Sequence, residues 1–584
     1  MFEDIPEDPQ LRSAWNGLVL RMERPEVFYT YEWALAVQRA YKSVLNPLLF
    51  LAYDEREELC GVAALAHDVK SRCISFLGAT TGDYCDFLSA PGRRPQFLDA
   101  VLSELRRRGV KRMAFANLPS DSATATMLPQ SSRRQGCRYF VRTAYICAQI
   151  VLDRLERSKD GHLTAPGQKR LRRFAKAMAL EGPLRLEHSR TWNSVAPSLQ
   201  PFLQAHVARF LDIGRISNLA NAQRRVFLEE LSKLLSEPQW LVLSQMRAGD
   251  RVVAWHYGFQ FRGSWFWYQP TFDSSVEKYW PGFCLLTQVI QEATENPAIT
   301  RLDLGLGSEA YKAKFANESR ETLYVALHIS LLEHWGTRLR YQTAAAVKAS
   351  PALEKIVGSI RNRLRAVRAQ LRNQGGKQTL ARMAKGLFQM LWLQEEVLFF
   401  EWENWQPSAD SRNLQLLPLD LNQLAVAAME YEQDEPTLTY LLRSARRLRA
   451  SGARGFILAN EDGRPLHFAW VASFDGFHCA ELNATLLASR DSVILFDCWT
   501  PAADRGKGYF KQAVQLIAAR MRVEGKRAWI FSTAGNVSSL RALNKTGFKR
   551  RHSLRRYRLL RWQMVSGNAP QSGAAAVAEV SAHV

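Results

Sequence analysis

Three stretches of the chain show the same order of apolar and polar positions. Residues 48–66, 241–259 and 456–474 each consist of an apolar strand, a polar turn and a second apolar strand, an order typical of a β-hairpin. Each hairpin is followed by a third apolar run, a segment with 3.6-residue periodicity that predicts a helix, and a further apolar run. Because this order of elements recurs, we expect three similar domains, each with a mixed α/β sheet.

The repeat divides the chain into segments. They are a first domain (1–150), a second domain (151–333), a connector (334–393), a third domain (394–565) and a tail (566–584). The tail consists mainly of small and polar residues, so we expect it to be disordered.

Positive charge is concentrated in the connector. The chain has a formal net charge of +22, and residues 335–390 contain twelve Lys or Arg and one acid, Glu354. Such charge favours a polyanionic neighbour (a nucleotide, an anionic lipid, nucleic acid or an acidic substrate), although a basic surface without a partner has the same composition. Positions 360, 364, 367 and 371 form an apolar helical face bordered by arginines. That face either lies on an anionic membrane or, as is commoner, packs on a neighbouring domain.

The chain carries no signal of membrane insertion or secretion. No apolar run reaches the roughly 18 residues of a membrane span, and the N-terminus, "MFEDIPEDPQ", is acidic where a signal peptide is basic. We therefore expect a cytoplasmic protein, with any membrane contact peripheral at the inner face. The eight cysteines lie in apolar segments without a CxxC pair or a Cys/His cluster, which predicts reduced core thiols and neither a metal site nor a disulfide framework.

A glycine-rich turn in the third domain suits anion binding. The segment "TPAADRGKGYFKQA" (500–513) lies between an apolar run and an amphipathic one. Backbone N–H groups at the start of the helix would point beyond the strand end, and glycines permit close approach of a pyrophosphate. Arg505 and Lys507 add positive charge. Neither the GxxxxGK[ST] nor the GxGxxG pattern is present.

This turn resembles the acyl-CoA pyrophosphate loop of GNAT acyltransferases, Gln/Arg-x-x-Gly-x-Gly/Ala. Residues 536–550, "NVSSLRALNKTGFKR", resemble the second signature of that family. The resemblance implies that acetyl-CoA or another acyl-CoA is the acyl donor. The cofactor contacts it implies are Arg505, Gly506, Lys507, Gly508, Tyr509, Phe510 and Asn536. Two positions depart from the pattern: Phe510 replaces a small residue, and Leu543 stands where many relatives have the tyrosine that protonates the thiolate.

Residues 25–330 resemble another GNAT branch, the CelD-type acetyltransferases associated with bacterial cellulose biosynthesis, which are distantly akin to Fem-type aminoacyltransferases. The matching segments are "GDYCDFL" in the first domain and "AWHYGFQF", "YQPTFDSSVEKYWPGFCLL" and "RLDLGLGSEAYKAKFAN" in the second. The resemblance implies a tandem Fem-like pair, joined by the connector to a separate third GNAT domain. The second domain lacks the glycine-rich loop, but Pro281 and Gly282, just after Lys278, place free N–H groups at a helix start.

Acyl transfer from a thioester requires a base for the acceptor, donors for the oxyanion and an acid for the thiolate. The segment "DLGLGSEAYK" at a strand end is the best local cluster, because loops at strand ends commonly carry sites. The candidate catalytic residues are Asp303, Glu309, Tyr311, His256 and, in the third domain, Asp497; the candidate substrate-binding residues are His206 and Lys312. Each of them taken singly also has a structural interpretation, as a buried histidine or a turn former.

Three functions remain open from the sequence. The first is an acyl-CoA-dependent N- or O-acyltransferase acting on a small-molecule or saccharide acceptor in bacterial exopolysaccharide, cellulose or envelope synthesis, a pathway that rests on the resemblance alone. The second is a non-catalytic or regulatory protein that assembles at a membrane polysaccharide synthase through residues 335–390. The third is Fem-like aminoacyl transfer from aminoacyl-tRNA, although the chain has no recognisable nucleic-acid motif.

Overall fold

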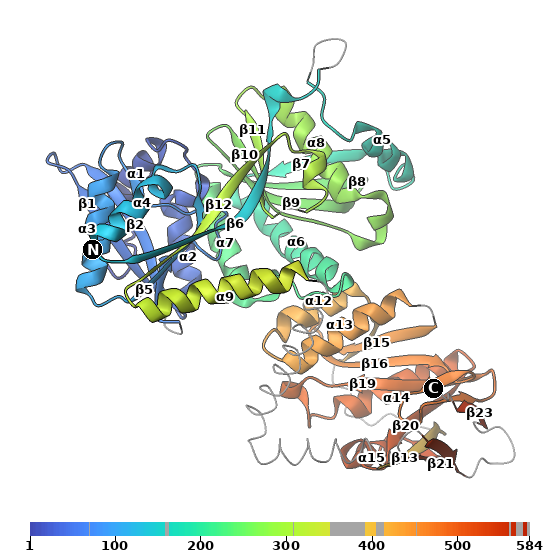
Figure 1. Ribbon diagram of the computed structural model, residues 1–584. Helices are drawn as coiled ribbons and strands as arrows, with labels where there is room; N and C mark the ends of the chain where they lie inside the picture. Colours follow the sequence, from blue (N-terminus) through green and yellow to red (C-terminus); the bar gives the residue numbers. More distant parts are fainter. Residues whose placement is uncertain are drawn as a thin grey trace. The chain divides into compact units, whose positions relative to one another are not determined.

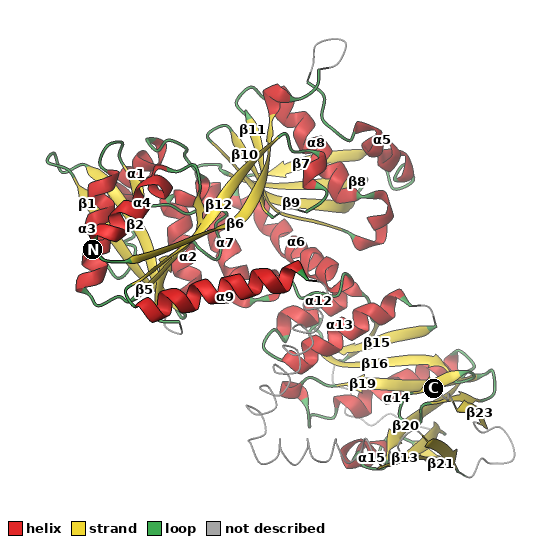
Figure 2. Cartoon of the chain, viewed as in Figure 1, coloured by secondary structure: helices red, strands yellow, loops and turns green. Residues whose placement is uncertain are grey.

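The computed structural model describes residues 1–68, 71–157, 163–307, 309–350, 392–403, 414–450, 452–559, 562–567 and 576–580. The chain divides into two units. Unit 1 comprises Met1–Arg209 and Asn221–Ala346, and unit 2 comprises Phe210–Ala220 and Val347–Val584. Each unit is built around a large mixed sheet with helices packed against it (Figures 1 and 2). The mixed α/β class predicted from the sequence is therefore confirmed.

The first half of unit 1 contains the first predicted hairpin. Its elements are α1 (Pro9–Leu20), η1 (Val27–Tyr29), α2 (Tyr31–Tyr41), β1 (Leu45–Tyr53), β2 (Leu59–Asp68), β3 (Cys73–Phe76), β4 (Leu88–Ser89), α3 (Arg94–Arg107), β5 (Arg112–Pro119), α4 (Ala123–Arg134) and β6 (Arg138–Val151). β1 and β2 pair antiparallel, and β3 and β5 pair parallel with α3 as the crossover. Apolar side chains of α3 and these strands form one core.

The second half of unit 1 contains the second hairpin, β8 and β9. The elements along this part of the chain are η2 (Leu152–Arg154), α5 (Gln168–Ala177), β7 (Leu184–Ser189), α6 (Trp192–Asp212), η3 (Asn218–Ala220), α7 (Ala222–Ser236), β8 (Leu241–Ala248), β9 (Arg251–Phe261), β10 (Ser264–Phe272), η4 (Ser274–Tyr279), α8 (Pro281–Glu295), β11 (Arg301–Leu306), η5 (Lys312–Lys314), β12 (Glu318–His328) and α9 (Leu331–Ala349). The end of α6 and η3 belong to unit 2. Side chains alternate along β9, so that Ala254 packs in the core under α8 while the Tyr257 hydroxyl reaches Leu228 on α7.

The two halves of unit 1 share one sheet. The strand order is β1-β2-β3-β5-β12-β6-β11-β10-β9-β8-β7, with β4 added on β2. β12, from the second half, pairs with β5 of the first, and β6 pairs with both β12 and β11. The expected boundary at residue 150 thus falls inside β6, whose ladders join the halves. Periodicity along the chain predicts strands but not their partners, which is why the sequence did not predict this exchange.

Unit 2 contains the third hairpin, β15 and β16. Its elements beyond residue 391 are β13 (Trp392–Trp402), β14 (Gln415–Pro418), α12 (Leu421–Glu430), α13 (Glu435–Arg449), β15 (Ala453–Ala459), β16 (Pro465–Ser473), β17 (Phe477–Cys479), β18 (Ala484–Leu487), β19 (Ser492–Trp499), η6 (Ala502–Asp504), α14 (Tyr509–Val523), β20 (Arg527–Thr533), α15 (Val537–Leu543), β21 (Phe548–Leu559), β22 (Trp562–Ser566) and β23 (Ala576–Val580). The main sheet has the order β14-β15-β16-β19-β20-β13-β21-β22. β17, β18 and β23 form a separate small sheet.

The structure describes part of the predicted tail but not the apolar face of the predicted connector. Within the segment expected to be a disordered tail, Ala576–Val580 form β23, which pairs antiparallel with β18. The apolar face at positions 360–371 lies outside the described residues.

All eight cysteines are unpaired, and five are buried. No helix within the described ranges is long and apolar enough to cross a membrane.

Candidate functional site

The neighbouring parallel strands β10 and β11 separate before either one ends. Their pairing joins Ser264–Phe266 to Arg301–Asp303 and stops there, although β10 continues to Phe272 and β11 to Leu306. Next to this point, the register of the antiparallel pairing between β10 and β9 shifts between Phe266 and Gln269. Backbone groups beyond this point have no ladder partner on the facing strand, an arrangement that can accept an extended chain by adding it as a strand. We call this opening the β10–β11 divergence.

Asp303 is fixed at the base of the divergence by donors from both halves of unit 1. Its Oδ2 accepts hydrogen bonds from Tyr84 Oη (2.7 Å) and Gln149 Nε2 (2.6 Å), and its Oδ1 accepts one from the Gly305 N–H (2.9 Å). The residue is 2% exposed. These contacts orient Asp303 as an anchor for its surroundings, since its acceptor positions are largely engaged.

Asp83 lies next to Asp303 and is partly exposed. Burial, and then the negative charge of Asp303, raise the pKa of Asp83 to about 7, against the opposing charges of Lys312 and Arg224. The Leu306 N–H donates to this carboxylate. A carboxyl group with a pKa near neutrality is suited to general-base catalysis. The sequence analysis quoted Asp83 within "GDYCDFL" but gave it no role, because nothing local indicates that it lies beside Asp303.

The loop that carries Asp83 is held in place by the second half of the unit. The Tyr268 hydroxyl donates to the Thr81 carbonyl, and Arg224 Nη1 donates to the Thr80 carbonyl (3.3 Å). Asn117, from β5, donates its amide to the Gly82 carbonyl at 2.9 Å. The position of Asp83 is thus set by fixed contacts rather than by a free loop, which is the preorganisation a catalytic group requires.

The contact between Gly305 and Asp83 gives a testable result. Gly305 has φ +71°, and a Cβ there would lie 2.7 Å from Asp83 Oδ2. We expect Gly305→Ala to lower the acyl-transfer rate roughly 10- to 100-fold, because displacing a reacting group by about 1 Å has an effect of this size. Gly307→Ala is the matched control: it has φ +106° in the same loop, but its Cβ would meet the exposed Glu309 carboxylate. An equal rate loss in the two variants would contradict the assignment. Thermal melts of both variants check that they are folded.

The predicted residues Glu309, Tyr311 and Lys312 lie at the same edge. Lys312 is buried, and its Nζ donates to the Leu306 carbonyl and to Glu309 Oε2, both at 2.8 Å. Tyr311 is partly buried, and burial together with the charge of Glu309 raises its pKa to about 12. Tyr311 is therefore protonated at neutral pH and retains a proton to donate. The structure brings these residues and Asp303 into one cluster, as their spacing suggested.

The two predicted histidines are buried beside the irregular part of β10. His256 stacks on Trp267, with ring centroids 4.1 Å apart, and its Nε2 lies 3.2 Å from the Phe266 carbonyl oxygen. His206 is hydrogen-bonded by the side chain of Gln269. Burial lowers the pKa of each histidine to about 3, with Arg209 adding to the effect on His206. Both imidazoles are neutral at pH 7 and support the shape of β10, and neither is basic enough to remove a proton efficiently.

A buried ion-pair network lies behind Asp303 and was not anticipated from the sequence. Arg320, on β12, donates Nη1 to Glu26 at 2.5 Å and Nε to Asp121 at 2.9 Å. Its guanidinium also lies 4.5 Å from the centre of the Tyr84 ring. Burial raises the pKa of Glu26 to about 7, although the Arg320 charge opposes this rise and the Asp303 charge adds to it. The network joins β12 of the second half to the first half of the unit.

The start of α8 is a candidate anion site. The helix begins at Pro281, as predicted, and its N-cap residue Trp280 has φ 60° and makes no side-chain cap. The Arg170 guanidinium lies 4.7 Å from the Trp280 ring centre, and Lys314 Nζ lies 5.8 Å from it. Uncapped N–H groups with nearby cations favour a bound phosphate. Because α8 follows β10, this helix end is on the side to which the β10–β11 divergence opens.

Unit 2 repeats the arrangement around the R-G-K-G turn. β19 pairs parallel with β20 over Ser492–Leu495 and then separates from it, and α14 begins at Tyr509. Gly506 and Gly508 have φ +78° and +84° with open space around them, so the turn requires glycine at both positions.

The side chains predicted to bind the cofactor in unit 2 are largely engaged within the unit. Lys507 Nζ pairs with the buried Asp504 at 2.8 Å, and Arg505 Nε donates to the Thr500 carbonyl at 3.1 Å. Asn536 caps α15 by accepting from the Ser539 N–H at 3.2 Å. Tyr509 is partly buried. Because these side chains are largely engaged, the predicted anion site relies mainly on the backbone N–H groups of the turn.

The candidate base of unit 2 is held by arginines. Arg443 and Arg447, on α13, donate to Asp497 Oδ1 (2.8 Å) and Oδ2 (2.6 Å). Leu543, at the position of the tyrosine in many GNAT relatives, is fully buried in the core. Phe510 also packs against this core, with its ring 5.8 Å from that of His467. Both carboxylate oxygens of Asp497 are therefore engaged by arginines within unit 2.

Comparison with known proteins identifies the class of the second half of unit 1. Residues 167–313 match the family profile described as "Acetyltransferase (GNAT) domain". The chain thus carries a GNAT acetyltransferase domain, which includes α8, β10, β11 and the cluster around Lys312. Acyltransferases of this class typically use acyl-CoA.

Solved structures show similarity at low identity. FemX is 10% identical, with a TM-score of 0.38 over 54% of this chain and 95% of that chain. The L-PGS structure from Bacillus licheniformis is 13% identical (TM-score 0.34; 51% and 93% covered), and a tandem GNAT protein from the clavulanic acid biosynthesis pathway is 12% identical (0.32; 55% and 96%). No curated protein sequence matches this chain. Similarities at these values carry no argument about its chemistry.

Proposed function

We propose that this protein transfers an acyl group from an acyl-CoA to an amine or hydroxyl at the β10–β11 divergence of unit 1. The observation that carries the proposal is Asp83, a partly exposed carboxyl group with its pKa raised to about 7, beside the GNAT acetyltransferase domain. Asp83 accepts the proton of the acceptor N–H or O–H as the acceptor nitrogen or oxygen attacks the thioester carbonyl carbon. The C–S bond then breaks, and Tyr311 is the candidate donor of the proton that the thiolate takes up.

In this proposal the other groups position Asp83 and the donor. Asp303 raises the pKa of Asp83, and Lys312 limits that rise. The uncapped start of α8, with Arg170 and Lys314, would receive the phosphates of the acyl-CoA. Its pantetheine amides would extend toward the unpaired backbone groups of the divergence. These assignments involve residues from both halves, which is consistent with the predicted tandem Fem-like pair.

We further propose that unit 2 is a third GNAT-like domain whose R-G-K-G turn holds a second acyl-CoA or a related nucleotide. The repeat of hairpin, diverging parallel strands and uncapped helix start supports this proposal. A non-catalytic role fits unit 2 better than catalysis, because Asp497 is engaged by two arginines and Leu543 supplies no hydroxyl. The acceptor class, a saccharide of exopolysaccharide or envelope synthesis, rests on the resemblance alone.

Titration calorimetry with CoA tests the donor site. We expect Arg170→Glu to weaken binding about tenfold or more, because a charge-assisted phosphate contact becomes a repulsive one. Arg172→Glu, an exposed position on the same helix, makes the same change in net charge and should bind like the wild type. Arg505→Glu and Gly508→Asp test the turn in unit 2 in the same way. Absence of CoA binding in every variant and in the wild type would refute the proposal.

Aminoacyl-tRNA is the alternative donor. Fem-like aminoacyl transfer would use the same base but a different donor. The two candidate functions are therefore distinguished by supplying either acyl-CoA or aminoacyl-tRNA to the same protein. Product formation only with aminoacyl-tRNA would replace the acyl-CoA assignment.

A further inference from the structure

α9 has an apolar stripe that the described residues of unit 1 leave largely exposed. Leu332, Trp335 and Leu339 are 84%, 55% and 62% exposed. Their spacing of i, i+3 and i+7 places them along one face of the helix. Exposed leucines at this spacing, together with a tryptophan, indicate a contact surface rather than isolated surface residues.

Another face of α9 is firmly attached to the sheet. The Tyr341 ring stacks on Phe140 of β6, with centroids 5.5 Å apart at 15°. The Arg142 guanidinium lies 4.5 Å from the Tyr341 ring centre and 5.0 Å from that of Tyr324. α9 therefore presents the stripe from a fixed position on unit 1 rather than as a free segment.

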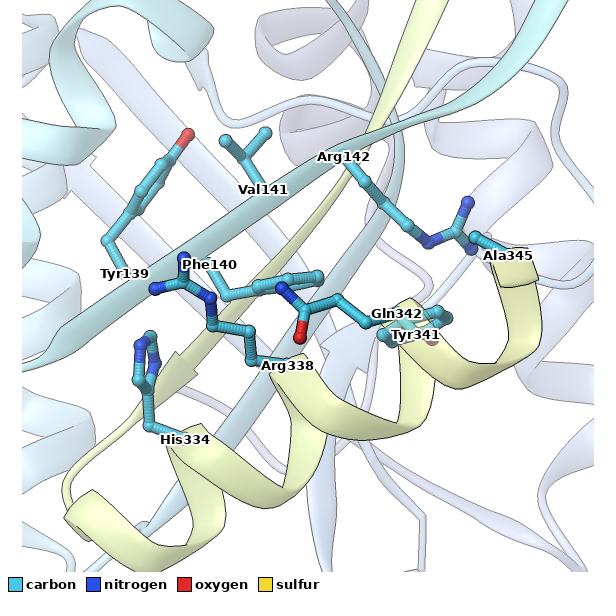
Figure 3. A pocket seen from close by; sticks show the side chains of 9 residues that line it. All are labelled: Tyr139, Phe140, Val141, Arg142, His334, Arg338, Tyr341, Gln342 and Ala345. Atoms are coloured by element: carbon cyan, nitrogen blue, oxygen red, sulfur yellow. The ribbon is translucent and has the colours of Figure 1, made fainter.

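A shallow groove runs between α9 and β6 beside the stripe (Figure 3). It encloses about 470 Å³, and its walls include Tyr139, His334, Arg338 and Gln342. Figure 3 shows the Arg338 side chain reaching from α9 across the groove toward β6. The groove is aromatic and cationic, and no acidic residue lines it.

The charges along α9 favour an anionic partner. Arg338 lies 5.3 Å from the Trp335 ring centre, and neither Arg338 nor Arg340 makes an ion pair within the described part of the chain. Glu333 is the single acid of the helix. The stretch 335–390, which begins on this helix, contains twelve Lys or Arg and one acid. An anionic lipid surface complements both the leucines and the arginines of this helix, because it offers acyl chains and phosphates side by side.

We propose that α9 docks the protein on the surface of an anionic membrane. Leu332 and Leu339 enter the boundary between headgroups and acyl chains, and Trp335 lies at the headgroup level, where tryptophan is favoured. Arg340 faces the lipid phosphates, and Arg338 in the adjoining groove adds positive charge near them. The helix lies in the plane of the surface and does not cross it. This inference is independent of acyl transfer, but it would bring the GNAT domain to acceptors held at a membrane.

Co-sedimentation of the full chain with vesicles tests the docking surface. We expect binding to vesicles of phosphatidylcholine with 30% phosphatidylglycerol, and at least tenfold weaker binding to pure phosphatidylcholine. Leu332→Glu with Leu339→Glu should weaken binding to the anionic vesicles at least tenfold. Leu180→Glu, at a fully exposed leucine outside α9, should leave binding to the anionic vesicles unchanged. Trp335→Ala should lower the affinity several-fold, whereas Trp562→Ala, at a more exposed tryptophan in unit 2, should not.

Several results would overturn the proposal. Equal binding to the two vesicle compositions would remove the role of the arginines, and full binding by the double leucine variant would remove that of the stripe. Absence of binding to anionic vesicles would refute docking altogether. The acyl-transfer rate on a soluble acceptor should be the same for the leucine variant and the wild type, which also shows that the variant folds.

Discussion

Asp83→Asn is expected to lower kcat about 10²- to 10⁴-fold, the range typical of a lost general base. Asparagine preserves the shape of the side chain but cannot accept a proton from the acceptor. In the wild type, kcat/KM should rise with pH through about 7, where Asp83 loses its proton. The variant should lack this rise. Asp86→Asn is the matched control in the same loop: burial raises the pKa of Asp86 to about 6, but Asp86 faces Arg94 rather than Asp303. Its rate should stay within about threefold of the wild type.

The same substitution should stabilise the protein at alkaline pH. The pKa of Asp83 is about 7 in the folded chain, above its ordinary value of 3.8. The folded state therefore favours the protonated form, and its stability falls as pH rises between these two values. Asp83→Asn removes that fall, so we expect its free energy of unfolding to exceed that of the wild type by on the order of 1 kcal/mol at pH 8, since the side chain is partly exposed. Near pH 4 the gain should vanish. Lower stability at pH 8 would show that the rate loss reflects damaged folding.

Arg320→Met should have the largest effect on stability. Arg320 is buried against Glu26 and Asp121, and removing one partner of a buried pair costs about 3–5 kcal/mol. The loss should be greater at pH 8 than at pH 5. Without Arg320 the pKa of Glu26 rises further. At pH 8 the folded chain must then either protonate Glu26 or bury its unpaired charge, and both lower its stability. Chemical denaturation at the two pH values measures the difference.

A double-mutant cycle checks the cause of this loss. Glu26→Gln in the Arg320→Met background removes the buried carboxylate, and it should recover part of the stability at pH 8. Arg247→Met, which breaks the surface pair with Glu187, should change stability by less than about 1 kcal/mol. A loss from Arg320→Met that does not vary with pH would indicate that packing around Tyr84, rather than the charge of Glu26, is responsible.

Local features of the fold were predictable from the sequence. The three hairpins, the helix start at Pro281 and the turn at Gly506 and Gly508 all occur where the pattern placed them. Each of them is a short-range property: side-chain alternation, a proline at the first helical position, or a backbone conformation that only glycine adopts readily. The order of Asp303, Glu309 and Lys312 along one loop likewise predicted their proximity.

The rest of the candidate site depends on contacts between distant segments. Tyr84 and Asp303 are 219 residues apart in the chain, yet they share a 2.7 Å hydrogen bond. The pairing of β12 with β5 brings Arg320 to Glu26, and no local pattern indicates that pairing. The burial that sets the pKa values of Asp83 and Glu26 arises only once both halves have closed around them.

The sequence by itself determined the α/β class, the three hairpins and the GNAT resemblance of the second half, because strand alternation, helix periodicity and turn residues act over a few positions. Only the tertiary structure decided that the first two expected domains share one sheet, that β10 and β11 diverge beside Asp83, and that Asp497 is engaged by arginines. These features depend on strand partners, burial and the charges of distant residues. Such quantities exist only in the folded chain, since they are set by which segments meet and how far water is excluded between them.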